Sequence, residues 1–201
     1  MIHVLVTVKP SERFPGKNNL LWKYTYLWLL SEKSCLDEKI NVYIVGDENE
    51  IKNIPNDVIL IHTETGGHLS DILAAESIIK PDKNDVFVLT QVTQPLRETG
   101  LLSKIVDSAR NNNSAVSVTR QSGPWRDVNC NGEWAGGKKT DKMCIDGALY
   151  AWTPGNAECI FTPHAKHGLI VNNAALIDID VPADMPDWLD TAWAKLILKT
   201  V

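Results

Sequence analysis

Short apolar runs alternate with helix-periodic segments through most of this chain, and this alternation constrains the fold more than any other feature. The apolar runs lie at residues 2–8, 40–45, 58–61, 85–90, 115–119 and 148–152. Runs of this length are too short for helices, which indicates buried strands. Between them, apolar residues recur at helical spacing over residues 20–33, 72–79 and 101–109. The pattern predicts a mostly parallel sheet covered by helices on both faces.

The alternation is interrupted once, by a segment rich in glycine. Residues 121–145 also contain Trp125 and Trp134, and we expect them to form an inserted hairpin or flap rather than a second domain. Beyond this segment, residues 169–171 and 176–179 are predicted strands, and residues 184–198 are a predicted closing helix. The 201 residues are therefore expected to form a single domain.

Composition excludes several classes of protein. The chain is 44% hydrophobic and 22% charged, which is typical of a globular domain. Its formal net charge of −5 offers no broad positive surface, so we expect neither nucleic acid nor a membrane as a partner. No apolar run approaches the roughly 20 residues of a membrane span, and no signal-peptide pattern opens the chain, so a cytoplasmic protein is expected. Cations for an anionic substrate would have to be concentrated in one pocket.

Ligands of parallel α/β sheets bind beyond the carboxyl ends of the strands, and three polar segments are expected there. The first, residues 9–18, joins the first strand to the first helix and reads Lys-Pro-Ser-Glu-Arg-Phe-Pro-Gly-Lys-Asn. It places three cations, Lys9, Arg13 and Lys17, where backbone amides and a helix N-terminus can hold phosphates. On its own, the segment is equally compatible with a solvated basic loop.

The second segment, residues 91–97, ends the fourth strand with amides and hydroxyls that could contact a sugar or a base. Taken alone, an ordinary proline-terminated strand end is the simpler interpretation. The third segment, residues 177–184, reads Ile-Asp-Ile-Asp-Val-Pro-Ala-Asp. In a strand, Asp178 and Asp180 would point to the same side, and a hard cation such as Mg²⁺ would relieve their repulsion. A solvated strand end is the alternative for this pair, and Asp184 is also well placed to cap the closing helix.

Taken together and in this order, the segments resemble the motifs of the acylneuraminate cytidylyltransferase family, whose members make CMP-activated sugar acids. The family's opening motif is similar to residues 8–18, its Gln-Pro-Thr-Ser-Pro-Leu-Arg to residues 91–97, and its Ile-Asp-Ile-Asp-x-Pro-x-Asp to residues 177–184. Its Asn-Gly-Ala-Ile-Tyr is similar to residues 146–150. The resemblance covers nearly the whole chain. It implies a three-layer α/β/α, Rossmann-like fold of the nucleotide-diphospho-sugar transferase type.

The resemblance also implies an activity, which is transfer of CMP from CTP to an acidic sugar such as sialic acid or a KDO-type acid, with release of pyrophosphate. The residues implied to bind CTP are Lys9, Ser11, Arg13, Lys17 and Asn18. Arg13 and Lys17 would be closest to the developing charge. Asp178 and Asp180 would hold Mg²⁺, and Asp180 would be catalytic. The residues implied to contact the sugar are Gln91, Arg97, Asp146 and Tyr150.

Two of these implications carry an alternative of their own. For Arg97, a structural arginine that hydrogen bonds to loop carbonyls is the stronger interpretation. The inserted segment, residues 121–145, helps to form a dimer in many family members, so the resemblance implies a homodimer with this segment at the interface. In this chain the segment is shorter than in those members.

Three departures from the family pattern bear on function, because Lys9 replaces an arginine, Glu12 a lysine and Asp146 an asparagine. Lysine keeps the charge of arginine but loses its bidentate contact with phosphate. Asp146 adds a negative charge beside a substrate that is expected to be a carboxylate. Three alternatives therefore stay open, namely a sister enzyme with another acceptor, a glycosyltransferase that uses a nucleotide-sugar, and a non-catalytic relative that binds a nucleotide.

Overall fold

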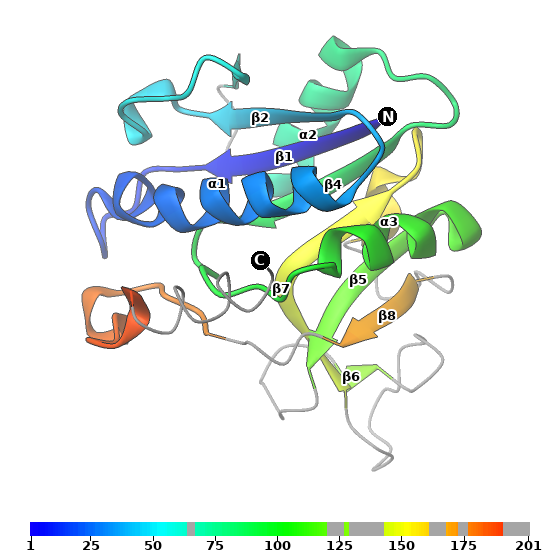
Figure 1. The fold of residues 1–201 in the computed structure, drawn as a ribbon. Helices are drawn as coiled ribbons and strands as arrows, with labels where there is room; N and C mark the ends of the chain where they lie inside the picture. Colours follow the sequence, from blue (N-terminus) through cyan, green and yellow to red (C-terminus); the bar gives the residue numbers. More distant parts are fainter. Residues whose placement is uncertain (64–66, 120–126, 129–142, 161–167, 173–176, 191–201) are drawn as a thin grey trace.

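The computed structural model describes residues 1–63, 67–119, 127–128, 143–160, 168–172 and 177–190 (Figure 1). Its strands are β1 (Ile2–Val8), β2 (Ile40–Gly46), β3 (Val58–His62), β4 (Val86–Gln91), β5 (Ser114–Thr119), β6 (Asp127–Val128), β7 (Met143–Trp152) and β8 (Gly168–Asn172). They form one sheet in the order β3-β2-β1-β4-β7-β5-β8, with β6 paired to β7. Strand β7 runs antiparallel to β4, β5 and β6, and the other pairs are parallel. The predicted mostly parallel sheet is confirmed.

Helices cover both faces of the sheet, as the sequence predicts. Helix α1 (Lys17–Cys35) and helix α3 (Leu101–Asn112) pack on one face, where their apolar residues share a core with alternate residues of β1 (Figure 1). Helix α2 (His68–Ile79) and the 3₁₀ turn η2 (Ala157–Ile160) pack on the other face, around Leu5, Phe87 and Trp152. Two further 3₁₀ turns are η1 (Glu48–Glu50) and η3 (Pro182–Asp184). No helix in the part of the chain that the structure describes is long and apolar enough to cross a membrane.

Two predictions for the C-terminal region are wrong. Residues 177–179 form no strand, and the segment is instead attached to the end of β4 by a 2.8 Å hydrogen bond from the Ile179 N–H to the Thr93 carbonyl. The closing helix does not begin at Asp184, because residues 185–188 are non-helical and helical conformation starts at Leu189. The Asp184 carboxylate accepts the N–H groups of Asp180 and Val181, at 2.9 Å each, so it caps a turn rather than the helix. Residues 173–176 and 191–201 lie outside the described part.

The inserted segment is described only in part. Strand β6 pairs with the first residues of β7, while residues 120–126 and 129–142 lie outside the described residues. The predicted flap at residues 121–145 and its contact in a dimer therefore stay predictions.

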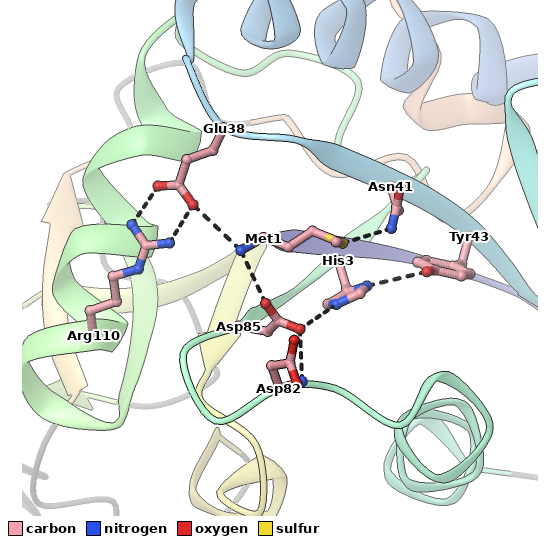
Figure 2. A network of polar contacts seen from close by, with 8 residues as sticks. All are labelled: Met1, His3, Glu38, Asn41, Tyr43, Asp82, Asp85 and Arg110. Atoms are coloured by element: carbon pink, nitrogen blue, oxygen red, sulfur yellow. Dashed lines mark hydrogen bonds and ion pairs between the residues drawn. The ribbon is translucent and has the colours of Figure 1, made fainter.

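A buried polar network joins three strands at the edge of the sheet where β1, β2 and β4 begin (Figure 2). His3 Nε2 lies 3.1 Å from Asp85 Oδ2, and His3 Nδ1 lies 3.2 Å from the Tyr43 hydroxyl. Asp85 also accepts the N–H of Asp82 at 2.9 Å, and its Oδ1 lies 3.0 Å from the main-chain nitrogen of Met1. Because the carboxyl ends of the same strands lie at the opposite edge, this network fixes strand packing without touching that edge.

Replacing Asp85 with asparagine is expected to lower the free energy of unfolding by about 1–3 kcal/mol at pH 7. Burial raises the pKa of Asp85, but hydrogen bonds from His3, the Asp82 N–H and the Met1 nitrogen outweigh it, so the pKa lies below its ordinary value. A lowered pKa stabilises the fold above the unfolded-state value, about 3.9, and that contribution is lost as pH falls through the folded-state pKa. Urea unfolding at pH 7 and at pH 3 should therefore show a deficit that shrinks in acid.

Asp57→Asn is the matched control for this prediction. Asp57 also accepts two side-chain hydrogen bonds, from Lys33 at 2.8 Å and from Tyr26 at 2.9 Å, but it is exposed. Exposed ion pairs contribute up to about 1 kcal/mol, so this variant should remain close to the wild type. Equal losses in the two variants would show that the buried network adds nothing beyond a surface pair.

Candidate functional site

A cavity of about 210 Å³ opens at the carboxyl edge of the sheet, where β1 and β4 end. All three polar segments singled out in the sequence contribute to its lining. The predicted site residues that line it are Lys9, Ser11, Lys17, Asn18, Gln91 and Asp180. The three segments, which are far apart in the chain, therefore come together at one place in the fold.

The loop between β1 and α1 is held in shape by two of these residues. The Ser11 hydroxyl accepts the N–H of Phe14 at 3.2 Å. The buried Asn18 amide donates to the Lys9 carbonyl and to Glu50 Oε2, at 2.7 Å each. Both Nδ2 contacts of Asn18 are therefore made within the protein and hold the loop in place. Asn18 also lines the cavity, and its predicted contact with a nucleotide stays a prediction.

The two lysines of the cavity are each paired with a carboxylate. Lys9 Nζ lies 2.9 Å from Oδ2 of the fully buried Asp71 on α2, and Lys17 Nζ lies 3.4 Å from Asp180 Oδ1. The Lys17 side chain is 12% exposed and that of Asp180 is 52% exposed. Arg13 lies exposed on the loop and is not among the residues that line the cavity. The structure therefore separates Arg13 from the two lysines with which the sequence grouped it.

Asp178 and Asp180 lie close enough to affect one another although they are not in a strand. Asp178 is exposed as a residue, but partial desolvation of its carboxyl group, followed by repulsion from Asp180, raises its pKa, while the Thr93 hydroxyl and Lys17 oppose the rise. Among the residues described, no three histidine, cysteine or acidic side chains converge as a metal cluster. Mg²⁺ is commonly held by one or two carboxylates together with substrate phosphates. The carboxylate oxygens of Asp178 and Asp180 fit that pattern. The Lys17 ammonium, itself a cation, lies beside Asp180.

Arg97 has the structural role that the sequence left as its stronger interpretation. The side chain is 2% exposed, and its guanidinium donates to the Gln91 carbonyl and to the Thr25 hydroxyl, at 3.3 Å in the second case. It also lies over the Trp28 ring, 5.1 Å from the centroid. The predicted contact with a sugar carboxylate does not fit this buried position. Arg97 instead positions the end of β4, and with it Gln91.

The remaining predicted sugar contacts are only partly brought together. Gln91 lines the cavity, whereas Tyr150 on β7 does not. Asp146 lies in β7, and its side chain is outside what the structure describes. The neighbouring Gly147 has φ +80°, and a Cβ there would lie 3.1 Å from the Gln94 amide nitrogen. This glycine therefore allows the β4 end and β7 to approach closely.

Two polar residues of the site were not found from the sequence. His68 and Thr7 also line the cavity, and the His68 Nδ1 lies 3.0 Å from the Thr7 hydroxyl. Thr93, from the second polar segment, lines it as well. His68 is the first residue of α2, and Asp71 follows one turn later with a hydrogen bond from Thr63 at 2.8 Å. The only local sequence signal for these residues is the His-x-x-Asp spacing at the start of the helix. That spacing does not predict that Asp71 pairs with Lys9.

Known proteins share the fold at low sequence identity. No family model and no curated sequence matches the chain. Among solved structures, a CMP:2-keto-3-deoxy-manno-octonic acid synthetase complexed with CTP has a TM-score of 0.68 at 13% identity, over 98% of this chain and 99% of that one. An inositol-1-phosphate CTP transferase from T. maritima has a TM-score of 0.62 at 12% identity, over 99% and 95%. A 4-diphosphocytidyl-2C-methyl-D-erythritol synthase from Anaerococcus prevotii has a TM-score of 0.62 at 12% identity, over 92% and 94%.

These similarities extend over nearly the full length of both chains in each comparison. They establish that this chain has the nucleotide-diphospho-sugar transferase-like α/β fold of those proteins. At such identities the comparison extends to the fold and not to the chemistry of the site.

Proposed function

We propose that this protein is a Mg²⁺-dependent cytidylyltransferase that transfers CMP from CTP to an acidic sugar and releases pyrophosphate. The observation that carries the proposal is the cavity in which Lys9, Lys17 and Asp180 meet at the carboxyl ends of β1 and β4. Parallel α/β sheets bind their ligands at this edge. The shared fold supports the proposal, because one structure with that fold is a CMP-sugar-acid synthetase bound to CTP.

The reaction would be an in-line attack of a sugar hydroxyl on the α-phosphorus of CTP, with pyrophosphate as the leaving group. Lys9 and Lys17 would neutralise the charge that spreads over the phosphate oxygens, and the N-terminus of α1 adds the positive end of its dipole. Asp178 and Asp180 would hold Mg²⁺, which when bound supplies Lewis-acid stabilisation to phosphate oxygens. Thr93 would fix Asp178 through its hydroxyl.

Lys17 is expected to exchange Asp180 for phosphate when the nucleotide binds. The pair is long, at 3.4 Å, and its acidic partner is half exposed, so the interaction is weak enough to exchange. A divalent cation at Asp180 would replace the ammonium there and free it for the nucleotide. Lys9 differs, because its partner Asp71 is fully buried, and we expect that pair to persist.

The acceptor side of the proposal rests on fewer contacts. Gln91 lines the cavity and would bind the sugar, with Tyr150 and Asp146 as further contacts. Arg97 is left out of this set because of its buried position. A homodimer with residues 121–145 at its interface and a cytoplasmic location complete the proposal.

The direct test is pyrophosphate release from CTP and Mg²⁺ in the presence of a panel of eight-carbon and nine-carbon acidic sugars. ATP, GTP and UTP serve as controls for the base. Release that requires one sugar and CTP would establish the reaction and identify the acceptor. Release with CTP and a neutral sugar would contradict the acidic acceptor while keeping the nucleotidyl transfer.

A second candidate is a relative that binds a nucleotide without transferring it. It is favoured by the separation of Arg13 from the cavity and by the pairing of both lysines with carboxylates. Calorimetry with CTP and Mg²⁺ would distinguish the two. Tight, metal-dependent binding with no pyrophosphate release for any sugar would favour the non-catalytic relative.

A further inference from the structure

A histidine lies among the cations of the cavity without a part in the proposed reaction. His68 begins α2, lines the cavity, and keeps its Nδ1 3.0 Å from the Thr7 hydroxyl. Burial lowers the pKa of His68, and the charges of Lys9 and Lys17 lower it further, while Asp71 acts in the opposite direction. The imidazole is therefore neutral at neutral pH when no ligand is present.

Among the residues that the structure describes, the charged groups that line the cavity or act on the pKa of His68 are Lys9 after β1, Lys17 at the start of α1, Asp71 on α2 and Asp180 in the segment that follows β8. The two lysines and their two carboxylate partners carry no net charge as a set. The polar groups contributed by β1, by the end of β4 and by the residues just after it, which are Thr7, Gln91 and Thr93, are neutral. A polyphosphate entering this cavity would meet a nearly balanced site rather than a strongly positive one.

We propose that His68 is a proton-linked phosphate-binding residue, which takes up one proton from solvent when a triphosphate enters the cavity. The imidazolium then provides a third cation beside the two lysines. The inference rests on the proposed function, because that function places a nucleoside triphosphate in this cavity. Its geometric basis is that the ring lines the same cavity as the two lysines, at the electropositive end of a 12-residue helix.

The hydrogen bond to Thr7 is compatible with both protonation states. A hydroxyl can donate to an unprotonated Nδ1 or accept from a protonated one, so Thr7 can keep the ring in place throughout. No heavy atom has to move for the proton to be gained. The added negative charge of the ligand is what favours the charged form.

The linkage has a definite sign. A group whose pKa is higher in the complex than in the free protein favours binding at low pH. Affinity is then greatest below the free-state pKa of the imidazole and falls as pH rises toward its pKa in the complex. For one linked proton, the steepest decline is about tenfold per pH unit.

The experiment is calorimetric titration with inorganic triphosphate at pH 7, in two buffers that differ in ionisation enthalpy. On binding triphosphate, the wild-type protein should take up more protons than His68→Gln, by a substantial fraction of one proton per molecule. The glutamine keeps a hydrogen-bonding group for Thr7 but does not titrate. Subtracting the two removes protons that belong to the ligand itself. Nuclear magnetic resonance of the wild-type imidazole should independently show a higher pKa of His68 in the complex.

His62→Gln is the matched control. His62 ends β3 and lines a neighbouring pocket that also contains Lys9, but its side chain is exposed. This variant should take up protons as the wild type does. Loss of proton uptake in both variants would show that the uptake reflects the electrostatic potential of the whole region and is not specific to His68.

The outcomes separate this inference from the proposed function. Triphosphate binding with equal proton uptake in wild type and His68→Gln, or an unchanged pKa of His68 in the complex, would overturn the inference alone. Failure of both triphosphate and CTP to bind the wild type would overturn the assignment of the cavity to a nucleotide, and the inference with it.

Discussion

Replacing Asp180 with asparagine is expected to lower Mg²⁺-dependent turnover by about a hundredfold to a thousandfold. Asparagine keeps the size of the side chain but removes one of the two negative charges that would hold the cation. It also removes the partner of Lys17, which lies 3.4 Å away. Because the aspartate is half exposed, the free energy of unfolding should change by no more than about 1 kcal/mol. Steady-state kinetics and urea unfolding of the same preparation would separate the two effects.

Asp190→Asn is a close control for Asp180→Asn. Asp190 pairs with Lys23 at 3.3 Å, so the two ion pairs link the same helix, α1, to the same C-terminal segment. The Asp190 side chain is 78% exposed and does not line the cavity. Its replacement should leave turnover unchanged.

Metal binding provides a readout that does not depend on turnover. Mn²⁺ titration followed by electron paramagnetic resonance should show weaker binding in Asp180→Asn than in Asp190→Asn. Undiminished turnover in Asp180→Asn would remove this residue from the metal site. Equal Mn²⁺ binding in the two variants would place the cation elsewhere.

The sheet could be predicted from the sequence because buried strands carry their own local signal. The predicted strand at residues 2–8 coincides with β1, and the predicted strand at residues 40–45 differs from β2 by one residue. The same reasoning failed at residues 177–179, the described part of the strand predicted at residues 176–179, where isoleucine and aspartate alternate. Alternation reports which side chains are buried, and Ile179 is indeed fully buried, but it does not report whether a neighbouring strand is present. At residues 177–179 the structure has one backbone hydrogen bond to the end of β4 and no ladder.

The sequence motifs predicted which residues lie near the site. They did not predict what each residue does there when its role depends on contacts made in the folded protein. Lys17 and Asp180 are separated by 163 residues, and the order of the motifs was enough to expect them together. The pairing of Lys9 with Asp71 had no such signal, because an ion pair depends on the fold and not on spacing. Arg97 shows the same limit. An arginine at the end of a strand suits a ligand or a carbonyl equally well, and only its burial over Trp28 distinguishes the two.

Replacing Gly46 with alanine is expected to destabilise the protein by about 3–5 kcal/mol, a large share of the stability of an ordinary domain. Gly46 ends β2 with φ +133°, a conformation that residues with a side chain rarely adopt. A Cβ there would lie 2.0 Å from the Val8 carbonyl oxygen and 3.1 Å from its carbon. Both atoms belong to the backbone of β1, so the clash can be relieved only by separating the paired ends of two central strands. Urea unfolding and soluble yield would measure the loss.

Gly155→Ala separates the two contributions to this effect. Gly155 also has a positive φ, +80°, but nothing lies within 4 Å of the position that its Cβ would take. Its replacement should cost only the backbone strain, about 1–2 kcal/mol. Similar losses in the two variants would show that the strand ends can move apart at little cost. If Gly46→Ala is folded at low temperature, it should also bind triphosphate more weakly, because Val8 precedes Lys9 and a displaced strand end would disturb the position of this lysine beside Asp71 and the cavity.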